Sequence, residues 1–439
     1  MTLRVSTKRE LFITLLIIFL LSVFVVFFRF NAIPKNLTFD EIEFSKLALS
    51  LDGKAYVPYS PLATGHATLY FYILLASMKL FGISSFALRL PAALFGVITP
   101  LVLFFVLRKS IRKTFPHHSP LLQEILPIAG AFLFATNRWY FNFARFSFEA
   151  TFLLFLELIS LYFVLKYSDH HQKKWLVYSA IFAGLAYNSY QPGRFFFAIP
   201  LLLIFLTILE RKQNRLDFSF FTKQTAHSFL SFLVPFFIVI LPLSLYLSSH
   251  QDIRMYQLFY PANTDMSVQE KGQFFLRNVS SSVGMFSIRG DVNGRHNYPN
   301  KPALNPIVSI LFILGLVFCV KDIKKKTNQL FLMYFLLSLV PTLLTYPWEN
   351  PNMLRTITVI PSVIYFSTIS LGTLFYFAEH KLKVRYTLLL FVLFGLISAS
   401  AVYDLRTYFL YQSTVFNEAF EATKPLQYYI NHPDAKIKQ

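Results

Sequence analysis

Long apolar stretches, each close to the length of a membrane-spanning helix, recur along the whole chain. A helix needs roughly 20 residues to cross the hydrocarbon core of a bilayer, and the stretches 11–28 and 386–403 approach that length. The pattern predicts an all-α integral membrane protein, a multi-span helical bundle with about eleven transmembrane helices. The expected spans are 11–28, 85–107, 121–137, 147–166, 175–190, 195–209, 228–247, 303–320, 329–345, 356–378 and 386–403.

Short loops between these spans carry clusters of basic residues, and their positions orient the bundle. When the N-terminus is placed in the cytoplasm, every cluster falls on the cytoplasmic side, as the positive-inside rule expects. The first span follows Lys8 and Arg9 and lacks a small-residue cleavage site, so it is interpreted as a retained helix. The clusters are Arg108, Lys109, Arg112 and Lys113; Lys166, Lys173 and Lys174; Arg211, Lys212 and Arg215; Lys321 and Lys324 to Lys326; and Lys381, Lys383 and Arg385.

The apolar segment 66–81 is treated differently, because counting it as a span would move every later basic cluster to the outer side. It is therefore predicted to lie along the outer membrane surface together with segment 40–51, where apolar residues alternate with charges. These segments are expected to form two interfacial helices in the first extracytoplasmic loop.

The resulting organisation is one polytopic membrane domain over residues 1–403, with a first outer loop at 29–84 and a large outer loop at 248–302. A short extracytoplasmic tail is expected at 404–439. Its apolar residues either pack on the outer loops or begin an outer domain that this chain lacks.

Composition supports the membrane interpretation and narrows the function. Of the 439 residues, 55% are hydrophobic and 14% are charged, unlike a soluble domain of this size. The formal net charge of +19 would suit nucleic acid, but loop orientation accounts for it more simply, so no nucleic-acid partner is expected. The single Cys319 excludes a disulfide within the chain. No Walker-type phosphate loop, zinc-spaced Cys/His cluster or internal repeat is seen, and the missing repeat weakens a two-halved transporter.

The first candidates for chemistry are Asp40 and Glu41, in the stretch that follows the first span. A carboxylate beside the bilayer can act as a general base toward a hydroxyl acceptor. Ordinary helix capping is the alternative, since Asp40 with Glu43 three residues later resembles an N-cap followed by a first-turn acid. Spacing alone favours capping.

A second candidate site lies at the outer end of the span 147–166. Arg145 and Glu149 are four residues apart and are expected to share a helix face, where a plain ion pair would explain them equally well. Glu157 lies deeper in the same span, where an acid is costly, and packing against a partner helix is preferred to a function there.

A third candidate is a basic set on the outer side, because guanidinium groups suit bidentate contact with a phosphate. Phospholipid headgroups are the alternative ligand. Three members lie in the polar, turn-rich stretch 289–299, which has the composition of a loop that folds back over a site or of a plain surface loop. The set is Arg194, Arg289, Arg295, His296 and Arg355.

These pieces together resemble the bacterial membrane glycosyltransferases related to protein O-mannosyltransferases and the lipid A aminoarabinose transferase. The resemblance runs in order from the first span to about residue 375, and the order is its evidence. The matching pieces are Phe39-Asp40-Glu41, Gly65-His66 through Tyr70 and Phe71, the segment 87–96, Ala144-Arg145 with Glu149, Tyr190-Gln191-Pro192-Gly193-Arg194, Arg295-His296-Asn297, and Leu354-Arg355-Thr356.

The resemblance implies the C-type glycosyltransferase fold, an active site in the first extracytoplasmic loop, and inverting transfer of a sugar from a polyprenyl-phosphate carrier. It implies that Asp40 is the general base, that Glu41 is a second acid, and that Arg145 and Glu149 lie near the carrier phosphate or the acceptor. The family often has His-Pro-Pro where this chain reads His66-Ala67-Thr68, so the sequence departs from the family around His66.

The expected function is therefore an inverting glycosyltransferase of the plasma membrane that works on the extracytoplasmic face. Its catalytic candidates are Asp40 and Glu41, and the acceptor is a protein, a lipid or a glycan. A divalent metal ion is allowed but not required, because basic side chains neutralise a phosphate equally well. A transporter or flippase for a lipid-linked or anionic substrate is the alternative, and a structural scaffold is a third. The expected substrate-binding residues are His66, Arg145, Glu149, Arg194, Arg295, His296 and Arg355.

Overall fold

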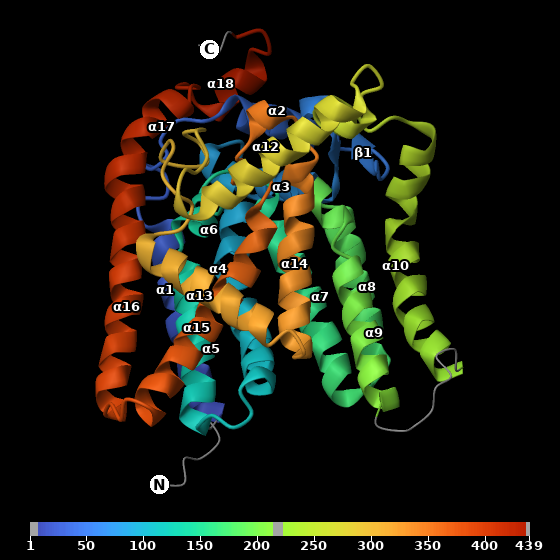
Figure 1. Cartoon of the computed structure of the whole chain (residues 1–439). Coiled ribbons are helices and arrows are strands. Elements are labelled where there is room, and N and C mark those ends of the chain that lie inside the picture. Colours follow the sequence, from blue (N-terminus) through green and yellow to red (C-terminus); the bar gives the residue numbers. More distant parts are fainter. Residues whose placement is uncertain (1–7, 214–222, 436–439) are drawn as a thin grey trace.

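A computed structural model describes residues 8–213 and 223–435, and the described chain is almost entirely helical. Long helices run side by side and form the body of the molecule (Figure 1). They are α1 (Lys8–Phe27), α4 (Ser85–Thr114), α5 (Pro120–Thr136), α7 (Ala150–His170), α8 (Lys174–Tyr187), α9 (Ala198–Gln213), α10 (Lys223–Ser249), α13 (Pro306–Lys321), α14 (Lys326–Leu343), α15 (Ile360–His380) and α16 (Tyr386–Arg406).

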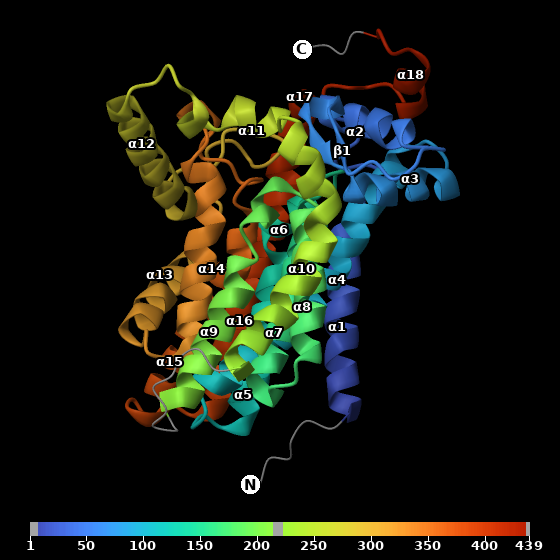
Figure 2. The same ribbon diagram turned by 90° about the vertical axis from the view of Figure 1, so that its right-hand side faces the viewer.

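Shorter elements gather toward one end of this bundle, which we call the site end (Figures 1 and 2). The C-terminus lies at the site end and the N-terminus at the opposite end. The elements are α2 (Phe39–Ser50), α3 (Leu69–Phe81), α6 (Arg138–Phe143), α11 (Ile253–Leu258), α12 (Val268–Ser287), α17 (Ser413–Ala419), α18 (Leu426–Asn431) and the antiparallel strands β1 (Tyr59–Ser60) and β2 (His66–Ala67).

The chain is an all-α multi-span membrane protein, as the hydrophobic pattern predicts. Seven helical stretches of the described residues are long and apolar enough to cross a membrane by length and composition. Three further apolar helices, Leu69–Phe81, Pro120–Thr136 and Pro306–Lys321, are shorter. Each of the expected spans contains a helix, and the count of about eleven crossings remains a prediction.

The first loop after α1 has the arrangement inferred from the positions of the basic clusters. Figure 2 shows α2 and α3 lying across the site end rather than along the bundle. Gly82, at a positive φ of 78°, ends α3, and the Ser84 side chain caps the start of α4, so the chain turns into the bundle within a few residues.

The C-terminal segment packs on the loops of the site end. Leu37 and Ala422 exchange backbone hydrogen bonds of 3.0 and 2.9 Å, and α18 contacts α2. Gln412, in the π-helical turn after α16, accepts a hydrogen bond of 3.2 Å from Arg138. The tail therefore forms part of the site end.

Close packing of α13 on α15 depends on one small residue. At Gly315 an added Cβ would overlap the carbonyl oxygen of Phe366, which belongs to the backbone and cannot rotate away. Nothing lies within 4 Å of the corresponding position at Gly395 in α16. The two glycines thus offer a tight and an open position in two apolar helices.

We expect Gly315→Ala to destabilise the protein by about 1–3 kcal/mol or more, because the helices must separate to admit the methyl group. Gly395→Ala should leave stability unchanged or slightly raise it, since alanine favours the helix. Thermal unfolding of the purified variants in one detergent compares them. Equal midpoints for the two variants would contradict this packing.

Candidate active site

Helix α2 begins with a capping box that differs from the one expected. Thr38 is the N-cap: its hydroxyl accepts from the Glu41 N–H at 3.0 Å, and the Glu41 carboxylate accepts from the Thr38 N–H at 3.0 Å. The expectation that Asp40 caps the helix with Glu43 was therefore wrong by two residues. Asp40 is not needed for the cap and stays available for another role.

Glu41 is fully buried and forms an ion pair with Arg89 of α4. The Arg89 Nε and Nη2 atoms donate to the two carboxylate oxygens at 2.7 and 2.9 Å. The Ser147 N–H adds a bond of 2.9 Å to the same carboxylate, and Arg89 also donates to the carbonyls of Pro34 and Asn36 at 2.6 Å. These contacts fix Glu41 and the start of α2, and its role as a second acid stays a prediction.

Asp40 points to a different environment. Its side chain is 48% exposed, and one carboxylate oxygen accepts from Arg295 Nη1 at 2.7 Å. Arg295 also binds Glu421 through Nη2 at 2.9 Å and the Ala419 carbonyl through Nε at 3.1 Å. The fold thus joins two predicted site residues that are 255 positions apart in the sequence.

A second cluster joins His66, Glu149 and Arg254. The His66 Nδ1 atom lies 2.9 Å from a Glu149 oxygen, and Arg254 Nη1 lies 2.7 Å from His66 Nε2. Since a guanidinium only donates, Nε2 accepts, and Nδ1 therefore carries the proton that is donated to Glu149. Burial lowers the pKa of His66 below its usual value, and Arg254 adds to this effect while Glu149 opposes it. The imidazole is neutral in this arrangement.

Tyr190 lies where charges from both clusters meet. Its ring is 5.7 Å from the Arg254 guanidinium. Burial raises the pKa of its hydroxyl; the charges of Arg254 and Arg355 oppose the increase, and those of Glu149 and Asp40 add to it. Arg355 is held by Glu349 at 3.0 Å and lines a small cavity together with Tyr190. Arg254 and Arg355 therefore both border the space beside Tyr190.

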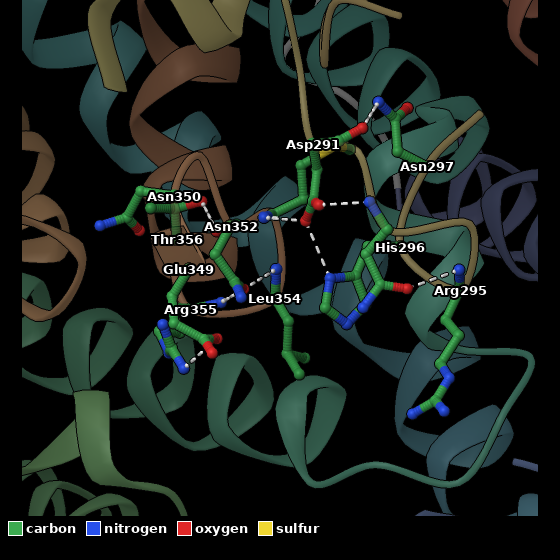
Figure 3. A network of polar contacts seen from close by, with 12 residues as sticks. Asp291, Arg295, His296, Asn297, Glu349, Asn350, Asn352, Leu354, Arg355 and Thr356 are labelled. Atoms are coloured by element: carbon green, nitrogen blue, oxygen red, sulfur yellow. Dashed lines mark hydrogen bonds and ion pairs between the residues drawn. The ribbon is translucent and has the colours of Figure 1, made fainter. Parts of the chain in front are cut away.

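The loop that carries Arg295 is anchored through Asp291 (Figure 3). One Asp291 oxygen accepts from His296 Nδ1 at 2.8 Å and from the Met353 N–H at 2.9 Å, which ties this loop to the segment before α15. In Figure 3 the His296 imidazole points toward Asp291, and the Arg355 guanidinium points toward Glu349.

Arg145 does not belong to this group. It lies in an irregular stretch before α7, which starts only at Ala150, so it does not share a helix face with Glu149 and the predicted pairing was wrong. Its guanidinium is buried at the C-terminal end of α1 and donates to several backbone carbonyls there and to the Tyr408 hydroxyl. The carbonyls are those of Val25 at 3.0 Å, Val26, Phe28 at 2.8 Å and Ile33 at 2.8 Å.

Two further members of the basic set also lie apart. Arg194 is paired with Asp252, whose other oxygen caps α11 by accepting from the Met255 N–H at 3.1 Å. Arg289 is exposed and donates to Asn300 at 2.8 Å. Glu157, the deep acid of α7, accepts a hydrogen bond of 2.5 Å from the Tyr334 hydroxyl of α14, consistent with packing against a partner helix.

Comparison with known proteins agrees with this architecture. Residues 65–241 match the model of a family described as dolichyl-phosphate-mannose-protein mannosyltransferase. A crystal structure of ArnT from Cupriavidus metallidurans bound to undecaprenyl phosphate superposes with a TM-score of 0.50 at 12% identity, covering 94% of this chain and 77% of that one. A crystal structure of the same protein in the apo state superposes with a TM-score of 0.51 at 13% identity, covering 92% of this chain and 76% of that one. The chain therefore has an ArnT-like membrane fold. No curated protein matches the sequence significantly.

Two residues of this candidate site, Tyr190 and Arg254, were not among the site residues predicted from the sequence. Tyr190 belongs to the matching piece Tyr190-Gln191-Pro192-Gly193-Arg194, but the charged Arg194 was chosen from it as the candidate binding residue. Arg254 stands in the polar stretch after the span 228–247 with no motif around it. Only the pairing of Arg254 with His66 identifies it, and this pairing joins positions 188 residues apart.

The donor groups near Asp40 do not form a metal site. Among residues 8–213 and 223–435, no group of three or more His, Cys, Asp or Glu side chains is placed to hold a metal ion. The carboxylates at the site are paired with arginine or histidine instead.

The neutral state of His66 makes stability depend on pH. Because the folded pKa lies below the unfolded value of 6.5, the unfolded state binds a proton first as the pH falls. The folded state is thus favoured above about pH 6.5 and loses up to about 1.4 kcal/mol per pH unit below it. We expect His66→Gln to flatten the fall of the unfolding midpoint between pH 8 and 5, while the exposed His432→Gln keeps the wild-type slope. A wild-type slope in His66→Gln would show that His66 is charged when folded.

Proposed function

We propose that the protein is an inverting glycosyltransferase that moves a sugar from a polyprenyl-phosphate carrier to an acceptor hydroxyl. The observation that carries this proposal is the half-exposed Asp40 carboxylate, which accepts a hydrogen bond of 2.7 Å from Arg295. At the same end of the molecule, Arg254 lies 5.7 Å from the Tyr190 ring, and Arg355 lines a small cavity with that tyrosine. A base and a cationic pocket are the two parts that such a transfer needs. The ArnT crystal structure with bound undecaprenyl phosphate supports a carrier of that class.

In the proposed reaction the acceptor oxygen forms a bond to the anomeric carbon while the bond from that carbon to the carrier phosphate breaks. Asp40 takes the acceptor proton, and the bonding electrons leave with the polyprenyl phosphate. Arg254 and Arg355 stabilise the negative charge that grows on the phosphate, which explains why both face one side of the site. Attack opposite to the leaving group inverts the anomeric configuration.

We further propose that the site end faces the extracytoplasmic side of the plasma membrane. Basic clusters lie toward the opposite end, where Lys113 and Lys324 to Lys326 line one cavity with Asp169 and Glu210. The N-terminus lies at that end too, and the positive-inside rule assigns it to the cytoplasm. Arg215 of the third cluster lies outside the described residues. Residues 1–403 would then form the membrane domain and the tail its outer cover.

Replacing Asp40 by asparagine should lower the transfer rate by about 10²- to 10⁴-fold, because the amide cannot accept the proton. The assay measures transfer from radiolabelled undecaprenyl-phosphate hexoses and pentoses to membrane acceptors by the purified protein. Asp52→Asn is the matched control, since Asp52 follows the same helix, is exposed and forms its ion pair with Lys79, away from the site. Undiminished transfer in Asp40→Asn would reject Asp40 as the base, and no transfer by the wild type with any donor would favour the transporter.

Arg254→Gln should raise the KM for the carrier-linked sugar by about 10- to 100-fold, since a hydrogen bond to a charged group contributes about 1.5–3 kcal/mol. Arg289→Gln, which removes an exposed arginine of the neighbouring loop, should change the KM little. Donor titrations at a fixed acceptor concentration separate the two variants. Equal effects would mean that general surface charge, rather than Arg254, attracts the carrier.

A further inference from the structure

A large cavity opens at the site end between α2, the loop at 293–295 and the C-terminal segment. Its volume is about 950 Å³. It is lined by Phe39, Ile42, Glu43, Lys46, Asn293, Gly294, Arg295, Glu418, Ala419, Glu421, Tyr429, His432, Pro433 and Ala435. None of the proposed carrier-binding residues Arg254, Arg355 and Tyr190 is part of this wall.

We infer that this cavity is the acceptor site and that it takes a neutral or amino-substituted saccharide. The inference rests on the proposed function, because it names the acceptor class for the same transfer. It assigns a role to the C-terminal segment, which supplies about half of the cavity wall.

The position of Asp40 supports an acceptor on this side. Its neighbours Phe39 and Glu43 on α2 line the cavity, and Arg295 of the cavity wall donates to the Asp40 carboxylate at 2.7 Å. The proposed carrier-binding residues Arg254 and Arg355 lie apart from this wall, beside Tyr190. An inverting displacement requires the nucleophile and the leaving group on opposite sides of the anomeric carbon. Separate spaces for the acceptor and the carrier, with the base next to the acceptor space, meet that requirement.

Charge decides the class of acceptor. Both cations of the wall are already paired, Lys46 with Glu43 at 2.9 Å and Arg295 with Glu421 at 2.9 Å and with Asp40. Glu418 is exposed and has no ion pair within the described residues. A phosphorylated or sulfated acceptor would therefore meet more carboxylate than free cation, whereas hydroxyl and amino groups find acceptors in these acids.

Size and apolar surface agree with a saccharide. The volume lies at the upper end of the roughly 300–1,000 Å³ of small-molecule sites, enough for several sugar units. The Phe39 ring is 49% exposed at the wall, and an exposed aromatic face packs against the C–H face of a pyranose ring. An aromatic ring among hydroxyl-binding acids is the surface expected for an oligosaccharide.

The C-terminal segment is fixed firmly enough to form a wall. Glu421 accepts from the Phe39 N–H at 2.9 Å as well as from Arg295, and the neighbouring Ala422 pairs with the Leu37 backbone. Phe420 is buried and lies under the Arg89 guanidinium, 5.8 Å from it. The same residues that seat the segment thus connect the cavity to α2.

A cysteine reporter tests occupancy without requiring turnover. The native Cys319 is buried in α13, so the wild type gives the background of maleimide labelling. Glu418→Cys places a thiol in the cavity wall, and Asn417→Cys places one on the adjacent exposed residue, which does not line the cavity. The probes are maltohexaose, a glucosamine hexamer, sulfated maltohexaose and a Ser/Thr-rich decapeptide.

We expect maltohexaose or the glucosamine hexamer to slow labelling of Glu418→Cys at least about threefold, as two-thirds occupancy requires, with no effect on Asn417→Cys. Sulfated maltohexaose and the peptide should protect less. Absence of protection by both uncharged and amino saccharides, or stronger protection by the sulfated sugar or the peptide, would overturn the inference. Transfer activity that persists without protection would reject only the acceptor site, whereas protection without transfer by any donor would reject the proposed function.

Discussion

The buried pair between Glu41 and Arg89 is the interaction on which the geometry of the site depends. Removing two charges from water is costly, and such a pair survives only where further hydrogen bonds complete it. Here the Thr38 and Ser147 N–H groups and the carbonyls of Pro34 and Asn36 do so. Consecutive helical residues point about 100° apart. Fixing Glu41 inward therefore turns its neighbour Asp40 outward, toward Arg295.

Arginines at the site end divide into two groups that composition alone cannot separate. Helices that stop inside a protein leave carbonyls without partners, and a guanidinium can supply several donors at once. Arg145 at the end of α1 and Arg138, which reaches the Pro302 carbonyl at 3.0 Å, serve the backbone in this way. Arg254 instead lies 5.7 Å from the Tyr190 ring, and Arg355 lines a small cavity with the same tyrosine. The groups that these arginines contact, rather than the number of arginines, distinguish structural arginines from those of the candidate site.

The sequence predicted the elements well and the contacts poorly, for physical reasons. Hydrophobic length located the helices, and the charge argument correctly separated α3 from the crossing helices, because both signals are local. The prediction that Arg145 and Glu149 share a helix face was wrong because the chain bends before α7. No residue propensity indicates that bend clearly. The contacts of Asp40 with Arg295 and of His66 with Arg254 join distant segments, which periodicity cannot reveal. Ordered family motifs brought Asp40, His66 and Glu149 into consideration, whereas Arg254 had no motif.

Arg295 links the proposed base to the C-terminal segment, and its two carboxylate partners have different chemical consequences. In the proposed reaction Asp40 takes a proton from the acceptor. It thereby loses its negative charge and its ion pair with Arg295. Arg295 still has Glu421, 2.9 Å away, so the cation is not left without a counter-ion at that moment. If Asp40 were the single carboxylate partner of Arg295, protonation of Asp40 would cost the whole energy of that ion pair. Sharing the arginine between two acids reduces that opposition, and the C-terminal segment thereby contributes to the chemistry of α2 without contacting the reacting atoms.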